Sequence, residues 1–217
     1  MQELHTHEIE SIKEFDVWAK TYHKGLWAPY FTSSYKRIAE VARPYLSQGV
    51  SVFDIACGTG GLGVLIYPFI AGGEYTGMDI SSEMISQARK GVRAGERKTF
   101  LEGRVDAIPR PDNSFDVIFC LNAFHHFPDP MHALGEIHRV LKPGGIYIML
   151  DNVNDGILKK IWIPVMTFLC NEKDVSFRSR RAFEDLLARA GFSIEKSESF
   201  LYFTQIFVVK KQNSVIE

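Results

Sequence analysis

The feature that most restricts the fold of this sequence is a regular alternation of two patterns after residue 50. Short runs rich in β-branched and aromatic residues alternate with longer stretches in which apolar residues recur at helical spacing. This alternation is typical of an open parallel sheet with helices on both faces, because each parallel connection needs a long crossover. The predicted parallel strands are residues 50–55, 74–79, 99–102, 115–120 and 146–150.

The connections and the end of the chain fit the same plan. Ser81 and Asp129 are suitable N-caps for two helices, and Gly191 marks the end of a third. Two late runs, residues 192–197 and 201–210, predict an antiparallel pair of strands at one edge. We therefore predict an α/β fold in three layers: a Rossmann-like, doubly wound, seven-stranded mixed sheet with five parallel strands plus the antiparallel edge pair.

Composition argues against several classes of protein. Because 25 Lys and Arg stand against 26 Asp and Glu, the net charge of -1 does not favour a nucleic-acid partner. Three distant cysteines, Cys57, Cys120 and Cys170, fit neither a disulfide framework nor a zinc cluster, which favours a reducing, cytoplasmic location. The acidic amino terminus lacks the pattern of a secretory signal, and the apolar run 161–170 is too short for an integral membrane segment.

The turn ACGTGGLG follows the first predicted strand and permits two interpretations. Gly58, Gly60 and Gly63 match G-x-G-x-x-G, and Asp79 follows at roughly the 20-residue spacing of an acid that binds a ribose. Glycines in such a turn let a ligand approach the backbone at the start of a helix. A dinucleotide-dependent oxidoreductase is therefore one interpretation.

Asp54 favours the other interpretation. A carboxylate at the end of the first strand would repel a pyrophosphate bound at the turn, whereas it would attract an ammonium group. A ligand with ribose hydroxyls, an adenine and an amino-acid ammonium, but no phosphate, suits both Asp54 and Asp79. S-adenosylmethionine is such a ligand.

Four segments carry a resemblance to a known family. VFDIACGTGGLG, YTGMDIS, GRVDAIPRPDNSFDVIFC and LKPGGIYIML resemble, in order and spacing, the motifs of the class I S-adenosylmethionine-dependent methyltransferases. The resemblance covers about residues 45–150 and is closest to the small-molecule branch, methyltransferase type 11, which includes quinone-biosynthesis enzymes. FDVWAKTY is similar to the opening of that branch. Ala56 departs from the family, which more often has glycine there, and Pro68 should shorten or kink the first helix.

The resemblance implies roles for the residues that match. Asp79 would accept hydrogen bonds from both ribose hydroxyls, Asp106 would bind the adenine amino group, and Asp54 would face the methionine ammonium. The aromatic amino-terminal segment would exclude water. The predicted cofactor-binding residues are Asp54, Ala56, Gly58, Gly60, Asp79, Ile80, Asp106, Ala107, Asn122 and Tyr22.

The loop LNAFHHFPD follows the fourth strand, where this family brings the acceptor to the methyl group. We predict His125 as the catalytic base, lining the pocket, with His126 packed under the following helix. A metal site is disfavoured, because no carboxylate or cysteine lies at helical spacing from the two histidines. Base catalysis is dispensable where the nucleophile, the methyl carbon and the sulfur are held in line.

The prediction for the whole chain is a single methyltransferase domain, residues 1–217. It comprises a helical cap (1–45), a cofactor-binding core (46–150), a substrate-side insertion (151–178), and the last helix and edge strands (179–211). It would transfer a methyl group from S-adenosylmethionine to a small apolar acceptor by in-line displacement, leaving S-adenosylhomocysteine. The alternatives are a non-catalytic S-adenosylmethionine-binding protein and an NAD-dependent oxidoreductase. The acceptor atom, the choice between monomer and homodimer, and membrane contact by residues 157–170 stay open.

Overall fold

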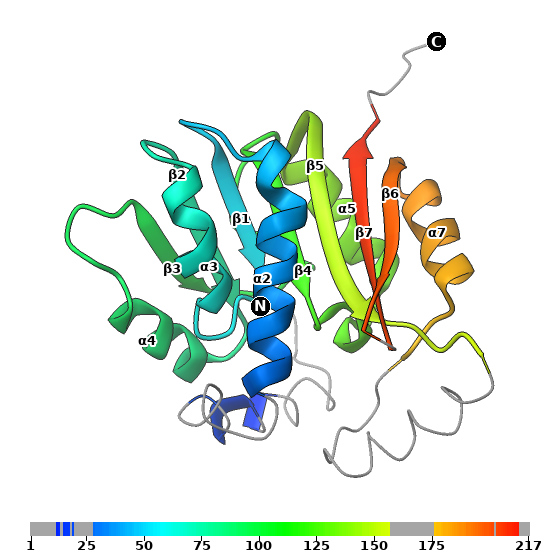
Figure 1. Cartoon of the computed structure of the whole chain (residues 1–217), viewed down its shortest axis with the longest axis horizontal. Helices are drawn as coiled ribbons and strands as arrows, with labels where there is room; N and C mark the ends of the chain where they lie inside the picture. The colour runs from blue at the N-terminus through cyan, green and yellow to red at the C-terminus, as the bar shows by residue number, and fades with distance from the viewer. Residues whose placement is uncertain are drawn as a thin grey trace.

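The computed structural model describes residues 12–13, 15–17, 19, 28–156, 176–201 and 203–212. Within these residues the chain forms one seven-stranded sheet with the order β3-β2-β1-β4-β5-β7-β6 (Figure 1). Strands β1 to β5 run parallel, and β7 pairs antiparallel with β5 and β6. The predicted fold class is confirmed. The strands are β1 (Ser51–Ile55), β2 (Glu74–Asp79), β3 (Lys98–Glu102), β4 (Phe115–Leu121), β5 (Leu141–Asn152), β6 (Phe192–Phe200) and β7 (Thr204–Lys211).

Helices cover both faces of the sheet, because the central strands carry apolar side chains on both faces. Val52 packs in a cluster with α2, α3 and α4, while the next residue, Phe53, packs in a cluster with α5 and α7. These helices give the predicted three layers, and α2 crosses in front of the sheet in Figure 1. Their bounds are α2 (Ala28–Ala42), α3 (Gly61–Ile66), α4 (Ser82–Lys90), α5 (Pro130–Val140) and α7 (Arg180–Arg189).

Both predicted N-caps are confirmed, and they fix helices that begin near the carboxyl ends of the strands. The Ser81 hydroxyl accepts the backbone N–H of Met84 at 3.1 Å. Asp129 Oδ1 accepts the N–H groups of Met131 and His132, each at 3.0 Å. Each cap satisfies backbone donors that have no partner within the helix, which contributes about 1 kcal/mol.

Three element boundaries have identifiable causes, and one of them is strand pairing that overrides the local sequence pattern. β5 begins at Leu141, before the Pro-Gly-Gly run, because Leu141 pairs with Phe115 across a register shift in β4. α3 ends at Ile66, and Pro68 lies in the 3₁₀ turn η2 (Tyr67–Phe69), as its missing backbone donor predicts. β7 begins at Thr204 rather than at residue 201, which has a positive φ of 52°.

Two further elements are short 3₁₀ turns. The 3₁₀ turn η1 (Arg43–Tyr45) follows α2, and η3 (Phe124–His126) follows β4. Among the residues that the structure describes, no helix is long and apolar enough to cross a bilayer. Residues 157–175 of the predicted insertion lie outside the described residues.

Candidate active site

A cavity of about 450 Å³ lies at the edge of the sheet where β1, β2 and β4 end. Its volume falls in the range of about 300–1,000 Å³ that small-molecule sites occupy. Open parallel sheets bind ligands at the carboxyl ends of their strands, at the topological switch point where the strand order reverses. Here the switch point lies between β1 and β4, because β1 pairs with β2 on one side and with β4 on the other. The cavity wall comes from the turn after β1, the end of β2, the loop after β3, the end of β4 and the first turn of α5.

Asp79, the last residue of β2, ties the glycine turn to the neighbouring strand. Its Oδ2 accepts the Gly58 N–H at 2.8 Å, and its Oδ1 accepts the Ser81 N–H at 3.0 Å. Burial raises the pKa of Asp79, and these backbone hydrogen bonds oppose the rise. Asp79 lies on the cavity wall. Each carboxylate oxygen retains room for a second donor, such as a hydroxyl group.

The turn between β1 and α3 requires left-handed backbone. Gly60 has φ 78°, and a Cβ there would lie 2.9 Å from the ring of Phe100. Ala56 has φ 54° and lines the cavity. A left-handed alanine costs roughly 1–2 kcal/mol. This strain explains why glycine suits the position of Ala56.

Asp54 is buried beside the cavity and does not line it. Its carboxylate accepts a hydrogen bond from the Tyr75 hydroxyl on the adjacent strand. Burial raises the pKa of Asp54 to about 7; the Tyr75 hydrogen bond opposes this rise, and the charge of Asp79 adds to it. Two buried carboxylates at one turn favour a cationic ligand group and disfavour a pyrophosphate.

Asp106 follows β3 and lies on the cavity wall next to a cation. Arg104 Nε and Nη2 donate to its two oxygens at 2.9 and 2.6 Å. The Arg104 hydrogen bonds lower the pKa of Asp106, which therefore stays ionised and can accept from an amino group. Arg104 and His132 line the same cavity.

The amino-terminal segment contacts the site at two points. The Tyr30 hydroxyl, from α2, donates to Asn122 Oδ1 at 2.6 Å. Asn122 follows β4 in left-handed backbone, φ 53°, and lines the cavity together with Phe15. Tyr22, the predicted contact from this segment, lies outside the described residues.

The two histidines of η3 occupy different surroundings. His126 lines the cavity, and its ring meets Phe15 edge-on, with centroids 5.5 Å apart. His125 does not line the cavity and is 4% exposed, with Nδ1 2.6 Å from Asp151 Oδ1. The ring of Phe177 stacks on His125 at 5.0 Å. The structure therefore places His126, and not His125, on the wall where the base was expected.

Comparisons with known proteins decide the family. A family model described as a methyltransferase domain matches residues 53–149. The demethylmenaquinone methyltransferase of Thermus thermophilus is 31% identical over 163 residues, which are 66% of this chain and 74% of that enzyme. The chain belongs to the class I S-adenosylmethionine-dependent methyltransferases. This methyltransferase is also similar to the uncharacterized methyltransferase YcgJ of Bacillus subtilis, 37% identical over 106 residues.

The coverage of these relatives differs. The Bacillus match covers 46% of this methyltransferase and 40% of the relative, so the chain spans less than half of that protein. A solved structure, a methyltransferase in complex with the Haloferax volcanii Trm112 methyltransferase activator, has the same fold. The TM-score is 0.75 at 24% identity, over 92% of this chain and 98% of that one.

Most of the predicted cofactor residues of this methyltransferase meet at one cavity. Those on its wall are Ala56, Gly58, Asp79, Ile80, Asp106 and Asn122, whereas Asp54, Gly60 and Ala107 are not on it. Sequence reasoning missed Arg104 and Phe15 as lining residues. The aromatic amino-terminal pattern pointed to the segment that carries Phe15, but only the fold shows which ring reaches the site.

Proposed function

We propose that this methyltransferase binds S-adenosylmethionine in the cavity and transfers its methyl group to a small apolar acceptor. The observation that carries the proposal is the pair of buried carboxylates, Asp54 and Asp79, at the glycine turn. Ribose hydroxyls and an ammonium group satisfy these carboxylates, whereas a pyrophosphate would meet repulsion. When bound, the cofactor supplies an electrophilic methyl group on a sulfonium sulfur.

Each residue has a defined part in holding the cofactor. Asp79 accepts from the ribose hydroxyls, and Asp106 accepts from the adenine amino group, with Ile80 beside the ring. The backbone of Ala56 and Gly58 holds the methionine part near Asn122, and the left-handed Gly60 shapes the turn. Asp54 acts on the ammonium group from beneath the turn, where burial leaves its charge poorly screened.

The acceptor side is assigned to the described residues on both sides of the cofactor-binding core, among them Phe15 and Phe177. Phe15 and Phe127 give the cavity aromatic walls, and Phe177 stacks on His125 next to it. The Thermus relative is named for a quinone substrate, which agrees with an apolar ring as the acceptor. Holding the acceptor atom in line with the methyl carbon in a site that excludes water provides much of the rate.

Where the acceptor atom loses a proton, His126 is the residue placed to receive it. His126 lines the cavity, whereas His125 is turned to Asp151. His125 was the sequence-based candidate, and it is reassigned to positioning η3. Methyl transfer from a sulfonium is compatible with this division, because the methyl carbon is already electrophilic and alignment supplies much of the rate.

The test is calorimetric titration of the protein with S-adenosylhomocysteine, with NADH as the competing ligand and Asp79→Asn as the control variant. Binding of S-adenosylhomocysteine that the variant loses supports the site; binding of NADH instead overturns it. Apolar quinone-like acceptors are then screened for transfer of a radiolabelled methyl group. Binding without transfer to any acceptor would favour the non-catalytic alternative.

A further inference from the structure

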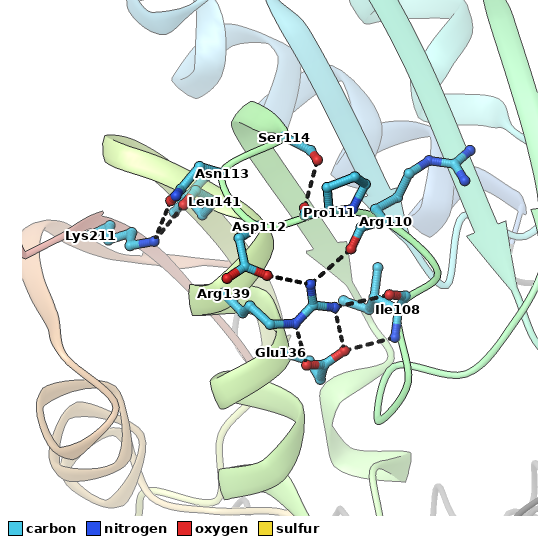
Figure 2. A network of polar contacts seen from close by, with 10 residues as sticks. All are labelled: Ile108, Arg110, Pro111, Asp112, Asn113, Ser114, Glu136, Arg139, Leu141 and Lys211. Atoms are coloured by element: carbon cyan, nitrogen blue, oxygen red, sulfur yellow. Dashed lines mark hydrogen bonds and ion pairs between the residues drawn. The ribbon is translucent and has the colours of Figure 1, made fainter.

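The loop between β3 and β4 carries Asp106 to the cavity, and the second half of α5 holds it there. Glu136 and Arg139 lie one helical turn apart on α5 and face the loop (Figure 2). They form a bidentate ion pair: Arg139 Nε donates to Glu136 Oε1 at 2.6 Å, and Arg139 Nη2 donates to Glu136 Oε2 at 2.7 Å. The pair is therefore a rigid unit with defined geometry.

This ion pair binds both backbone groups of a single loop residue. Glu136 Oε2 accepts the Ile108 N–H at 2.9 Å, and Arg139 Nη2 donates to the Ile108 carbonyl at 3.0 Å. Arg139 Nη1 adds a hydrogen bond to the Arg110 carbonyl at 2.8 Å. The Ile108 side chain is 4% exposed and packs in the apolar core. The position of Ile108 is thus determined by its backbone and its side chain together.

Fixing Ile108 also fixes the residues just before it. Asp106 and Ala107 immediately precede it, and Asp106 lies on the cavity wall. The Ala107 N–H donates to the Arg104 carbonyl at 3.3 Å, which closes a tight turn. A turn held at one end by Ile108 leaves the Asp106 carboxylate little freedom to move along the wall.

We propose that Glu136 and Arg139 are positioning residues that make the site selective for an adenine over a purine without the amino group. The inference rests on the proposed function, because it takes the purine at Asp106 to be that of the cofactor. An ionised carboxylate at a fixed place accepts from the amino group and rejects a carbonyl oxygen. A loosened loop lets Asp106 move away, and both the affinity and the discrimination fall.

The experiment compares two ligands, S-adenosylhomocysteine and S-inosylhomocysteine, by calorimetry on the full chain. The variants are Arg139→Gln and Glu136→Gln; the second keeps an oxygen for the Ile108 N–H. The matched control is Asp112→Ala, which removes an exposed partner of the same guanidinium, 2.9 Å from Arg139 Nη1, without touching Ile108. We expect Arg139→Gln to weaken S-adenosylhomocysteine about tenfold and the inosine compound much less. The affinity of Glu136→Gln for S-adenosylhomocysteine should lie between those of Arg139→Gln and the Asp112→Ala control.

A second readout needs no ligand. Amide hydrogen exchange at residues 106–110 should accelerate in Arg139→Gln, while exchange in β2 stays as in the wild type. Equal weakening of both ligands with an unchanged ratio, or unchanged exchange in the loop, overturns the inference. A wild-type protein that binds neither ligand overturns the proposed function, and this inference with it.

Discussion

Asp151 holds His125 at two points: Oδ1 lies 2.6 Å from His125 Nδ1, and Oδ2 accepts the His125 backbone N–H at 3.1 Å. The carboxylate, at the end of β5, is fully buried and also accepts the Asn152 N–H. It thereby orients the imidazole with Nδ1–H toward Asp151 and joins η3 to the neighbouring strand. The next residue, His126, is consequently presented to the cavity.

Asp151→Asn should destabilise the protein by roughly 2–4 kcal/mol, because an amide replaces a buried acceptor that serves several donors. His125→Asn should have a similar cost. The double variant should cost at least about 1 kcal/mol less than the sum, since both changes break one interaction. Urea denaturation measures all three. Additive losses would show that the two side chains do not depend on each other.

His126→Asn should lower kcat on a proton-losing acceptor by about 10²-fold and flatten the acidic limb of the pH profile. Its effect on stability should be small, because the ring lies on the cavity wall. His125→Asn is the comparison variant. It should lower the melting temperature and leave the shape of the pH profile unchanged. A flattened profile in His125→Asn alone would return the role of base to His125.

Asp54 should make the protein less stable as the pH rises. Its pKa is raised from the ordinary 3.8 to about 7 in the folded state, so the folded state binds the proton more tightly. This proton stabilises the folded state by roughly 4 kcal/mol in total. The stabilisation is fully present below about pH 4 and is lost as the pH rises through 7. The raised pKa of Asp79 acts in the same direction.

Asp54→Asn provides the test of that pH dependence, because the amide keeps an oxygen for the Tyr75 hydroxyl and removes the charge. Unfolding free energies at pH 5 and pH 8 should differ clearly less in the variant than in the wild type. The same difference in both proteins would show that Asp54 does not titrate in this range.

The glycine turn offers a pair of opposite substitutions. Ala56→Gly should stabilise the protein by about 0–1 kcal/mol, since relief of left-handed strain is partly offset by the entropy of the unfolded glycine. Gly60→Ala should destabilise it by at least about 2 kcal/mol, because its Cβ would strike the Phe100 ring as well. Thermal unfolding measures both, and a destabilising Ala56→Gly would contradict the account of strain.

The sequence by itself determined the elements of this protein. Strand and helix periodicity located the sheet, side-chain oxygens at Ser81 and Asp129 marked helix starts, and the glycine turn with Asp79 and Asp106 marked the edge of the sheet where the cavity lies. These signals are local, because propensity, capping and left-handed backbone depend on residues close in the chain.

Only the tertiary structure decided which distant residues of the chain contact one another. A period of two tells which residues share a face, but not which strands are neighbours. Pairing of β1 with β2 brings Tyr75 to Asp54, and pairing of β4 with β5 brings Asp151 to His125. The packing of α5 brings Arg139 to Ile108, 31 residues away in the chain. Contacts at such separations depend on strand order and helix placement, which no single stretch of sequence encodes.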